Sequence, residues 1–247
     1  MKDIKELANE LTKTLNIMKE TKEKIKTVED TYLKWFNENK TYLFTQEFTQ
    51  EFTQEKKETL KEECDKRNKK AAELRKNIKE LSIKVKALEN NIQYSFVENN
   101  TSYIEEILNK YATKRVGEKT KTKIKKELQD ILLEKNNIDN IYLYLNIKEY
   151  NSGIYIRFEI NKSRFEVEYN ILSSQKWFND NREKDIKIKL NNIYCYIDNI
   201  DKYTTYIINE QEKIKAEKEK LNKEIEKFNN NLKGKDLYNT YNIRSCY

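Results

Sequence analysis

The chain has 247 residues and a net charge of +7, and its charged fraction, 37%, equals its apolar fraction, which argues against one thick core. Histidine is absent, which excludes Ser-His and Cys-His catalytic pairs and histidine-ligated zinc, and the three glycines are too far apart for a phosphate-binding loop. We therefore expect no enzymatic activity and no cofactor.

The sequence also predicts a cytoplasmic protein. The N-terminal segment MKDIKELANEL is charged and has no apolar core, so it does not match a secretory signal. No window approaches the roughly 18 to 20 apolar residues that span a bilayer, and we expect no membrane partner. Cys64, Cys195 and Cys246 are an odd number at unrelated spacings, which indicates free thiols in a reducing compartment.

Residues 1–36 place apolar side chains three and four positions apart, the spacing of one helical face. The stripe consists of Ile4, Leu7, Leu11, Met18, Ile25, Val28, Tyr32 and Trp35, with Thr14 and Thr21 at two positions. Residues 37–41 are the only candidate bend after this helix. They contain neither glycine nor proline to mark it.

Residues 44–55 repeat the tetrapeptide Phe-Thr-Gln-Glu three times. On a helix, a four-residue step places Phe44, Phe48 and Phe52 in one slowly drifting stripe. Two interpretations are open. The stripe is either a packed helix face or an exposed aromatic ridge that a partner protein covers.

The strongest pattern begins at Leu60 and has a period of 3.5 residues over more than four heptads. Its members are Leu60, Cys64, Ala71, Leu74, Ile78, Leu81, Val85, Leu88 and Ile92, with Arg67 as the polar exception. A 33-residue helix is about 50 Å long and needs a partner along its length. An antiparallel hairpin over residues 1–98 is favoured, and a continuous helix that dimerises in parallel is the alternative.

Residues 99–200 predict a small α+β head. Ser102 and Glu105 form a capping box that starts a short helix ending near residue 112. A helix at residues 120–134 buries Ile124, Leu128, Ile131 and Leu132. Alternation then predicts a three-stranded antiparallel meander, with strands at residues 141–147, 154–160 and 165–169. A short helix with Trp177 and Phe178 and two strands, at residues 186–190 and 193–197, follow.

Residues 201–233 predict a last helix, and residues 234–247 a tail. The apolar ladder of this helix is Ile207, Ile214, Leu221, Ile225, Phe228 and Leu232, interrupted by Gln211 and Lys218. We expect it to pack on the coiled coil or to extend it. The fold class is therefore α+β: a long antiparallel helical coiled coil, made of an N-terminal hairpin and a C-terminal helix, with a small antiparallel-sheet head.

Eight basic side chains and one acidic side chain, Glu118, lie between residues 110 and 126, a local balance equal to the net charge of the chain. The basic residues are Lys110, Lys114, Arg115, Lys119, Lys121, Lys123, Lys125 and Lys126. A basic loop at a helix N-terminus attracts phosphate, so we predict contact with RNA, DNA or an acidic partner protein. Arginine is scarce, which disfavours base-specific readout.

Aromatic residues also recur along the predicted strands: Tyr142, Tyr144, Tyr155, Phe158, Phe165 and Tyr169. Such residues can stack on single-stranded nucleic acid, but cross-strand packing is the favoured interpretation.

A magnesium nuclease is the least favoured alternative. The order of elements over residues 120–190 resembles the outline of a restriction-endonuclease-like core, whose metal site uses an acidic residue and a Glu-x-Lys motif. Here Glu166 is followed by Glu168 instead of lysine, and Asp185 and Lys187 fall on a later strand. We expect no catalytic residue and no metal site.

The sequence therefore predicts a non-enzymatic coiled-coil interaction protein that occupies a surface of another macromolecule, a protein or a protein–nucleic-acid complex, with homodimerisation through the coil as one arrangement. Lys, Asn, Ile and Tyr, which AT-rich genomes encode readily, are abundant. This composition motivates the hypothesis of a phage or mobile-element inhibitor of a protein–nucleic-acid machine. The main alternative is direct nucleic-acid binding through the basic loop at residues 114–126.

Overall fold

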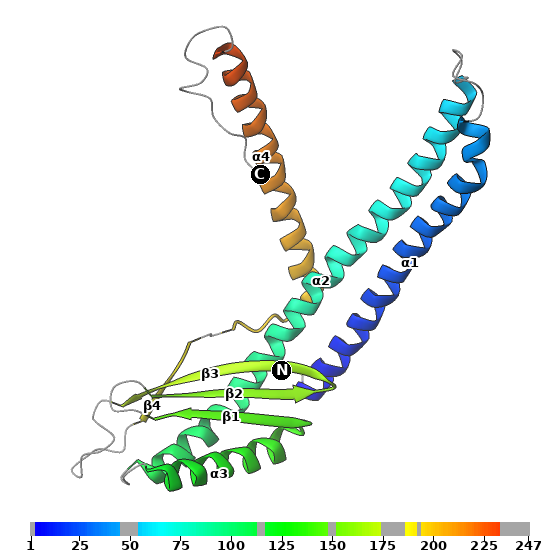
Figure 1. The fold of residues 1–247 in the computed structure, drawn as a ribbon. Coiled ribbons are helices and arrows are strands. Elements are labelled where there is room, and N and C mark those ends of the chain that lie inside the picture. Colours follow the sequence, from blue (N-terminus) through cyan, green and yellow to red (C-terminus); the bar gives the residue numbers. More distant parts are fainter. Residues whose placement is uncertain are drawn as a thin grey trace. The chain divides into compact units, whose positions relative to one another are not determined.

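The computed structural model describes residues 3–44, 54–112, 117–147, 152–173, 186–191 and 194–232. In these residues it contains four helices and one four-stranded antiparallel sheet, so the α+β class is confirmed (Figure 1). The chain divides into two compact units, Met1–Asp198 and Asn199–Tyr247, which are described separately.

Helices α1 (Ile4–Phe44) and α2 (Gln54–Tyr111) pack along one another as an antiparallel hairpin (Figure 1). Tyr32 Oη lies 2.9 Å from Cys64 Sγ, and Ser82 Oγ donates to Met18 Sδ at 3.7 Å. In these two contacts, the residue number in α2 rises as the residue number in α1 falls, as an antiparallel pair requires. The predicted hairpin is confirmed, and the alternative of one continuous helix that dimerises in parallel is wrong.

The predicted bend at residues 37–41 is wrong, because these residues lie inside α1. Asn39 Nδ2 donates to the carbonyl oxygen of Trp35 at 2.8 Å, so this side chain bonds within the helix instead of forming a turn. The connection at residues 45–53 lies outside the described residues, as does the side chain of Phe44. The aromatic ridge of Phe44, Phe48 and Phe52 therefore stays a prediction.

The predicted seams of both helices are confirmed. Every member of the α2 seam is buried or half-buried, and burial deepens toward the sheet, where Leu88 and Ile92 are 1% and 0% exposed. Thr21 takes a buried position in the α1 seam. Its hydroxyl donates to the carbonyl oxygen of Ile17 at 2.8 Å, which satisfies the polar group inside the contact.

The predicted helix start at Ser102 is also wrong, because α2 continues through this segment to Tyr111. Asn100 Nδ2 donates to the carbonyl oxygen of Phe96 at 2.6 Å, and Thr101 Oγ1 donates to that of Val97 at 2.7 Å. The polar side chains next to the predicted cap therefore bond to the preceding turn of the same helix. As a result, one 58-residue helix runs from the hairpin into the head.

Helix α3 (Glu118–Asn136) confirms the predicted helix at residues 120–134, with Ile124, Leu128 and Leu132 fully buried. Two buried amides join α3 to α2. Asn100 Nδ2 donates to Asn136 Oδ1 at 2.9 Å, and Asn136 Nδ2 donates to Asn100 Oδ1 at 2.8 Å. The pair satisfies two polar groups in an otherwise apolar contact.

The sheet has the order β1-β2-β3-β4, and every neighbouring pair is antiparallel. Its strands are β1 (Asn140–Asn146), β2 (Ser152–Ile160), β3 (Ser163–Ser173) and β4 (Ile186–Leu190), which confirms the predicted meander and the strand after it. Asn161 and Lys162 connect β2 to β3 with positive φ values of 51° and 65°. Two such residues make the tight turn that suits twisted hairpins.

The predicted fifth strand at residues 193–197 is wrong, because the described part of it, 194–197, pairs with no strand. Its backbone bonds to α2 instead. Asn90 Nδ2 donates to the carbonyl oxygen of Cys195 at 2.7 Å, and the Asn91 amide bonds to both the nitrogen and the carbonyl oxygen of Ile197. The predicted short helix with Trp177 and Phe178 lies outside the described residues.

The core of the head lies between one face of the sheet and helices α2 and α3. Phe158 of β2 is fully buried and stacks on Phe96 of α2, with ring centroids 4.1 Å apart, and on Phe165 of β3 at 5.3 Å. Burial also raises the pKa of the Tyr169 phenol. The remaining core side chains of β1 to β3 are Ile141, Leu143, Ile154, Ile156, Ile160, Val167 and Ile171.

Helix α4 (Ile200–Leu232) belongs to the second unit and confirms the predicted last helix. Asn199 Oδ1 accepts a hydrogen bond from the backbone nitrogen of Lys202 at 2.9 Å, which caps its first turn. Of the ladder, Ile214, Leu221 and Phe228 are exposed, at 52%, 45% and 44%. That α4 packs on the coiled coil stays a prediction, and the tail at residues 234–247 lies outside the described residues.

Candidate interaction site

One face of the sheet is not covered by α2 and α3, and we call it the open face. Tyr142 and Tyr144 of β1 are 53% and 57% exposed there, and Leu172 of β3 is 49% exposed. The strand register places Tyr142 opposite Arg157, and Tyr144 opposite Tyr155, on β2. Large aromatic and apolar side chains therefore gather on a surface that is exposed to solvent, where small polar side chains would be sufficient.

The structure divides the six strand aromatics into two groups. Phe158, Phe165 and Tyr169 point into the core, which confirms the packing interpretation for these three. The other three lie on the open face: Tyr142, Tyr144 and Tyr155. Only this second group is placed where a partner could reach it.

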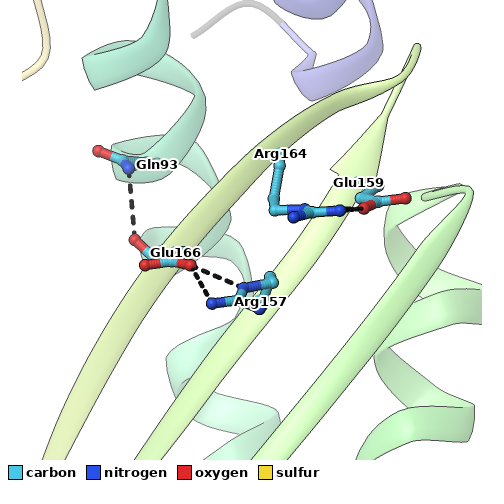
Figure 2. A network of polar contacts seen from close by, with 5 residues as sticks. All are labelled: Gln93, Arg157, Glu159, Arg164 and Glu166. Atoms are coloured by element: carbon cyan, nitrogen blue, oxygen red, sulfur yellow. Dashed lines mark hydrogen bonds and ion pairs between the residues drawn. The ribbon is translucent and has the colours of Figure 1, made fainter.

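Two Arg–Glu pairs cross the open face between β2 and β3 (Figure 2). Arg157 contacts Glu166 with N–O distances of 2.6 and 2.7 Å, and Arg164 contacts Glu159 at 2.9 Å. Hydrogen bonds from Tyr155 and Arg157 lower the pKa of Glu166. The four charges therefore balance one another, and Glu166 stays ionised at neutral pH.

Helix α2 holds β3 in place behind these ion pairs. Gln93 Nε2 of α2 donates to the backbone oxygen of Glu166 at 3.3 Å (Figure 2). The backbone position of Glu166 is therefore tied to α2 while its carboxylate is tied to β2. This arrangement fixes the open face before any partner arrives.

Some basic side chains of the predicted segment form ion pairs, and others are exposed on the surface of α3. Lys110 pairs with Glu127 at 2.9 Å, and Lys121 pairs with Glu118 at 2.8 Å. Three exposed lysines are spaced as one stripe along α3: Lys119, Lys123 and Lys126. Lys114 and Arg115 lie outside the described residues. The segment therefore presents fewer uncommitted charges than its sequence suggests.

Lys125 joins the basic helix to the open face. Its ammonium nitrogen lies 5.0 Å from the centroid of the Tyr142 ring, within the range of a cation–π contact. Helix α3 also contacts β1 through Gln129, whose Nε2 donates to the carbonyl oxygen of Ile141 at 3.3 Å. The lysine stripe and the tyrosines of β1 therefore belong to neighbouring elements of one compact unit.

The predicted coiled-coil interface is occupied within the chain. Its seven residues are all buried or half-buried in the first unit: Leu60, Leu74, Ile78, Leu81, Val85, Leu88 and Ile92. They therefore do not present a free apolar surface to another molecule.

Metal-binding geometry is not seen in the part of the chain that the structure describes. There, no group of three or more Cys, Asp or Glu side chains could hold a metal ion. Glu166 is held by Arg157, and Asp185 lies outside the described residues. Cys64 and Cys195 are free cysteines.

No family model matches this chain, and neither a curated protein nor a solved structure is significantly similar to it. Among the described helices, none has the length and apolar content needed to cross a membrane. The function of the chain must therefore be inferred from the chemistry of its own surfaces.

Proposed function

We propose that this chain is a non-enzymatic interaction protein that binds a partner protein through the open face of its sheet. The observation that carries the proposal is the exposure of Tyr142, Tyr144 and Leu172 on one face while the opposite face is fully packed. Exposed apolar side chains that gather on a rigid surface are typical of interaction sites. Tyrosine and arginine are the residue types enriched at such sites.

The paired charges on β2 and β3, at the centre of the open face, favour a protein over a polyanion. Each of its two arginines, Arg157 and Arg164, is paired with a carboxylate of the same face. A nucleic-acid phosphate would meet those carboxylates together with the arginines. A protein surface with mixed charges can instead exchange hydrogen bonds with both members of each pair.

The helical hairpin supports this function as a scaffold. Helix α2 is continuous from the hairpin into the head, where it packs under the sheet, so the two are joined by one rigid element. The composition-based hypothesis completes the proposal: the partner belongs to a protein–nucleic-acid machine in the cytoplasm, and the chain is a phage or mobile-element protein that inhibits it.

The test is affinity purification from the chain's own host, with Tyr144→Ala compared with Tyr206→Ala. The two tyrosines are matched in exposure, 57% and 61%, but Tyr206 lies on α4. We expect a stoichiometric protein partner with the wild type and with Tyr206→Ala. With purified partner, Tyr144→Ala should weaken binding about 30-fold, as truncation of a central interface tyrosine does.

Equal binding by wild type, Tyr144→Ala and Tyr206→Ala would overturn the proposal. Circular dichroism of each variant provides the control for folding. Since Tyr144 is exposed, its truncation should leave the helical signal unchanged.

A second function, direct binding of single-stranded nucleic acid, is favoured by one specific contact. Lys125 lies over the Tyr142 ring, beside the stripe of Lys119, Lys123 and Lys126. Lysines next to exposed aromatic rings combine attraction to phosphate with a surface for base stacking. This function would use the α3 edge of the open face and not its paired centre.

Fluorescence anisotropy with single-stranded RNA and DNA tests the second function. The variant replaces the three stripe lysines with glutamate. The matched control replaces Lys220, Lys223 and Lys227 of α4 with glutamate, which changes the net charge by the same amount. The second function predicts lost affinity for the stripe variant only, and wild-type binding that weakens as salt rises. Equal losses in both variants would contradict it.

A further inference from the structure

Within the described residues of the second unit, helix α4 has an exposed apolar face. The 33-residue helix exposes Ile214, Leu221 and Phe228 at 52%, 45% and 44%. These residues stand seven positions apart. A strict seven-residue repeat is the pattern of a helix that winds around another helix, because it keeps one seam facing the partner.

The repeat defines heptad positions along α4. The d positions are all apolar: Ile200, Ile207, Ile214, Leu221 and Phe228. The a positions, four residues after each d, are Thr204, Gln211, Lys218, Ile225 and Leu232. The d side of the seam is therefore continuous, and the a side is polar in its central turns. Thr204 is already buried, at 4% exposed, so the part of the seam that a second copy can cover follows it along the helix.

We propose that α4 binds α4 of a second copy of this chain in a parallel, in-register, two-stranded coiled coil. The proposal goes beyond the function of the open face, because no residue of the sheet takes part in it. It specifies the occupant, the direction and the number of strands. Each of these follows from a different set of residues.

The charges beside the seam determine the direction. The three central g positions are Glu210, Glu217 and Glu224. An antiparallel pair brings the g positions of both helices against each other, so glutamates would face glutamates. A parallel pair brings each g position against the e position five residues later in the second copy. There, Glu210 meets Lys215, and the pair forms twice by symmetry.

The intrachain ion pairs of α4 do not oppose this contact. Glu210 pairs with Lys213 at 2.7 Å, and Lys215 pairs with Glu219 at 3.9 Å, all on the exposed surface of the helix. Exposed pairs of this kind are weak, and a carboxylate has two oxygens that can accept from two donors. Glu210 can therefore keep Lys213 and add Lys215 of the second copy.

The polar a positions determine the register and the number of strands. In register, Gln211 meets Gln211 and Lys218 meets Lys218, so each polar residue avoids an apolar neighbour. A shift by one heptad would place Lys218 against Ile225. A polar residue at a specifies register in this way. Near the seam of a two-stranded coil, a long Lys side chain can extend to water and to Glu217 of the second copy.

Cysteine cross-linking tests direction and register in the full chain. Cys64, Cys195 and Cys246 are first replaced with serine, and then one cysteine is introduced as Ile207→Cys or as Phe228→Cys, at opposite ends of the seam. Under mild oxidation, each single variant should form a covalent dimer with its own equivalent. Lys223→Cys, at an outward-facing f position, is the matched control and should remain a monomer band.

Other cross-linking outcomes overturn the proposal. If only a mixture of Ile207→Cys and Phe228→Cys forms the dimer, the coil is antiparallel. If no variant forms more covalent dimer than the Lys223→Cys control does, the apolar face of α4 is covered by its own chain or by another protein.

Light scattering coupled to size exclusion tests the number of strands. One chain has a mass of 30.0 kDa, so the wild type should show about twice that mass, and Leu221→Lys should return it to that of one chain. Lys220→Ala, one residue away and outside the seam, should leave the dimer unchanged. A wild-type mass of one or three chains, or a dimer that survives Leu221→Lys, overturns the proposal. Tyr144→Ala should not change the mass. The test of the α4 dimer is therefore independent of the test of partner binding by the open face.

Discussion

Helices α2 and α4 carry the same kind of seam in sequence, but in the described residues the α2 seam is buried or half-buried, whereas the centre of the α4 seam is exposed. In α2, Leu88 and Ile92 are 1% and 0% exposed, whereas Leu221 and Phe228 of α4 are 45% and 44% exposed. Helix α2 has both α1 and the sheet to pack against. The comparison shows that a 3.5-residue period predicts the helix and its apolar face, but not which element covers that face.

The polar residues of the two seams explain part of this difference. In the α1 seam, the buried polar residue Thr21 is short and bonds to its own helix, whereas the long polar residue of the α2 seam, Arg67, is only half-buried. In α4, the central seam positions are Gln211 and Lys218, whose long polar ends need water or a charged partner. Short polar residues fit a seam that is buried within the chain, whereas a lysine fits one that stays close to solvent.

The largest expected effect is a loss of stability in Leu88→Ala that is not seen in Leu221→Ala. Truncation of a fully buried leucine should lower the free energy of unfolding by about 2–5 kcal/mol. Urea denaturation followed by tryptophan fluorescence measures it, because both tryptophans, Trp35 and Trp177, belong to the first unit. Leu221→Ala should leave this transition unchanged. Equal losses for the two variants would remove the distinction between the seams.

The next effect concerns the buried pair of amides, Asn100 and Asn136. Asn100 lies close to the residue where a new helix was predicted to start. Asn100→Ala leaves the buried Asn136 Oδ1 without its donor, although Asn136 Nδ2 still donates to the carbonyl oxygen of Leu132, and should lower the free energy of unfolding by about 1–3 kcal/mol. The double variant Asn100→Ala/Asn136→Ala should lose less than the sum of the two single losses, since it removes both polar groups. Strictly additive losses would mean that the two side chains do not act as a pair.

A smaller effect is expected at the start of α4. Asn199→Ala removes the oxygen that accepts from the nitrogen of Lys202, and loss of such a cap costs about 1 kcal/mol. Faster hydrogen exchange in the first turn of α4 would report this loss. Asn199→Asp keeps an acceptor and is the matched control. If alanine and aspartate behave alike, the cap is not what starts the helix.

The smallest effect is a pKa change on the open face. Arg157→Gln should raise the pKa of Glu166 toward the ordinary carboxyl value, although the bond from Tyr155 is retained. Because folding lowers this pKa, the stability contribution of Glu166 is present above the ordinary carboxyl pKa and is lost as pH falls through the lowered value. NMR titration of the Glu166 carboxyl carbon measures the shift.

Arg164→Gln is the control for this titration, because Arg164 pairs with Glu159 and contributes least to the pKa of Glu166. A Glu166 pKa that does not respond to Arg157→Gln would show that the cross-strand pair is absent in solution.

Periodicity was sufficient to predict the helices of the hairpin, α3 and the strands of the meander, because each depends on an apolar pattern that repeats along one element. The antiparallel arrangements were predicted from the short connections between these elements. The errors share a different cause. Residues 37–41 and Ser102 lie in polar segments that suggested helix ends, yet Asn39 and Asn100 bond to carbonyls of the same helix. A short amide can cap a helix or bond within it, and only the packing around it decides.

The candidate site was only partly predictable. Alternation correctly placed Tyr142 and Tyr144 opposite the buried residues of β1, but which face the helices cover depends on contacts distant in sequence. The Arg157–Glu166 pair could have been predicted, because a two-residue turn at Asn161 and Lys162 fixes that register. The ion pair between Lys110 and Glu127 could not have been predicted, since Glu127 lies on another helix.

Amide hydrogen exchange of the full chain at two concentrations, a hundredfold or more apart, tests most directly whether the two seams differ in how they are covered. We predict that protection of α1 and α2 is the same at both concentrations, because their seam is closed within one chain. Protection of α4 should rise with concentration, because its partner is a second copy. Concentration-independent protection of α4, or concentration-dependent protection of α2, would contradict this account.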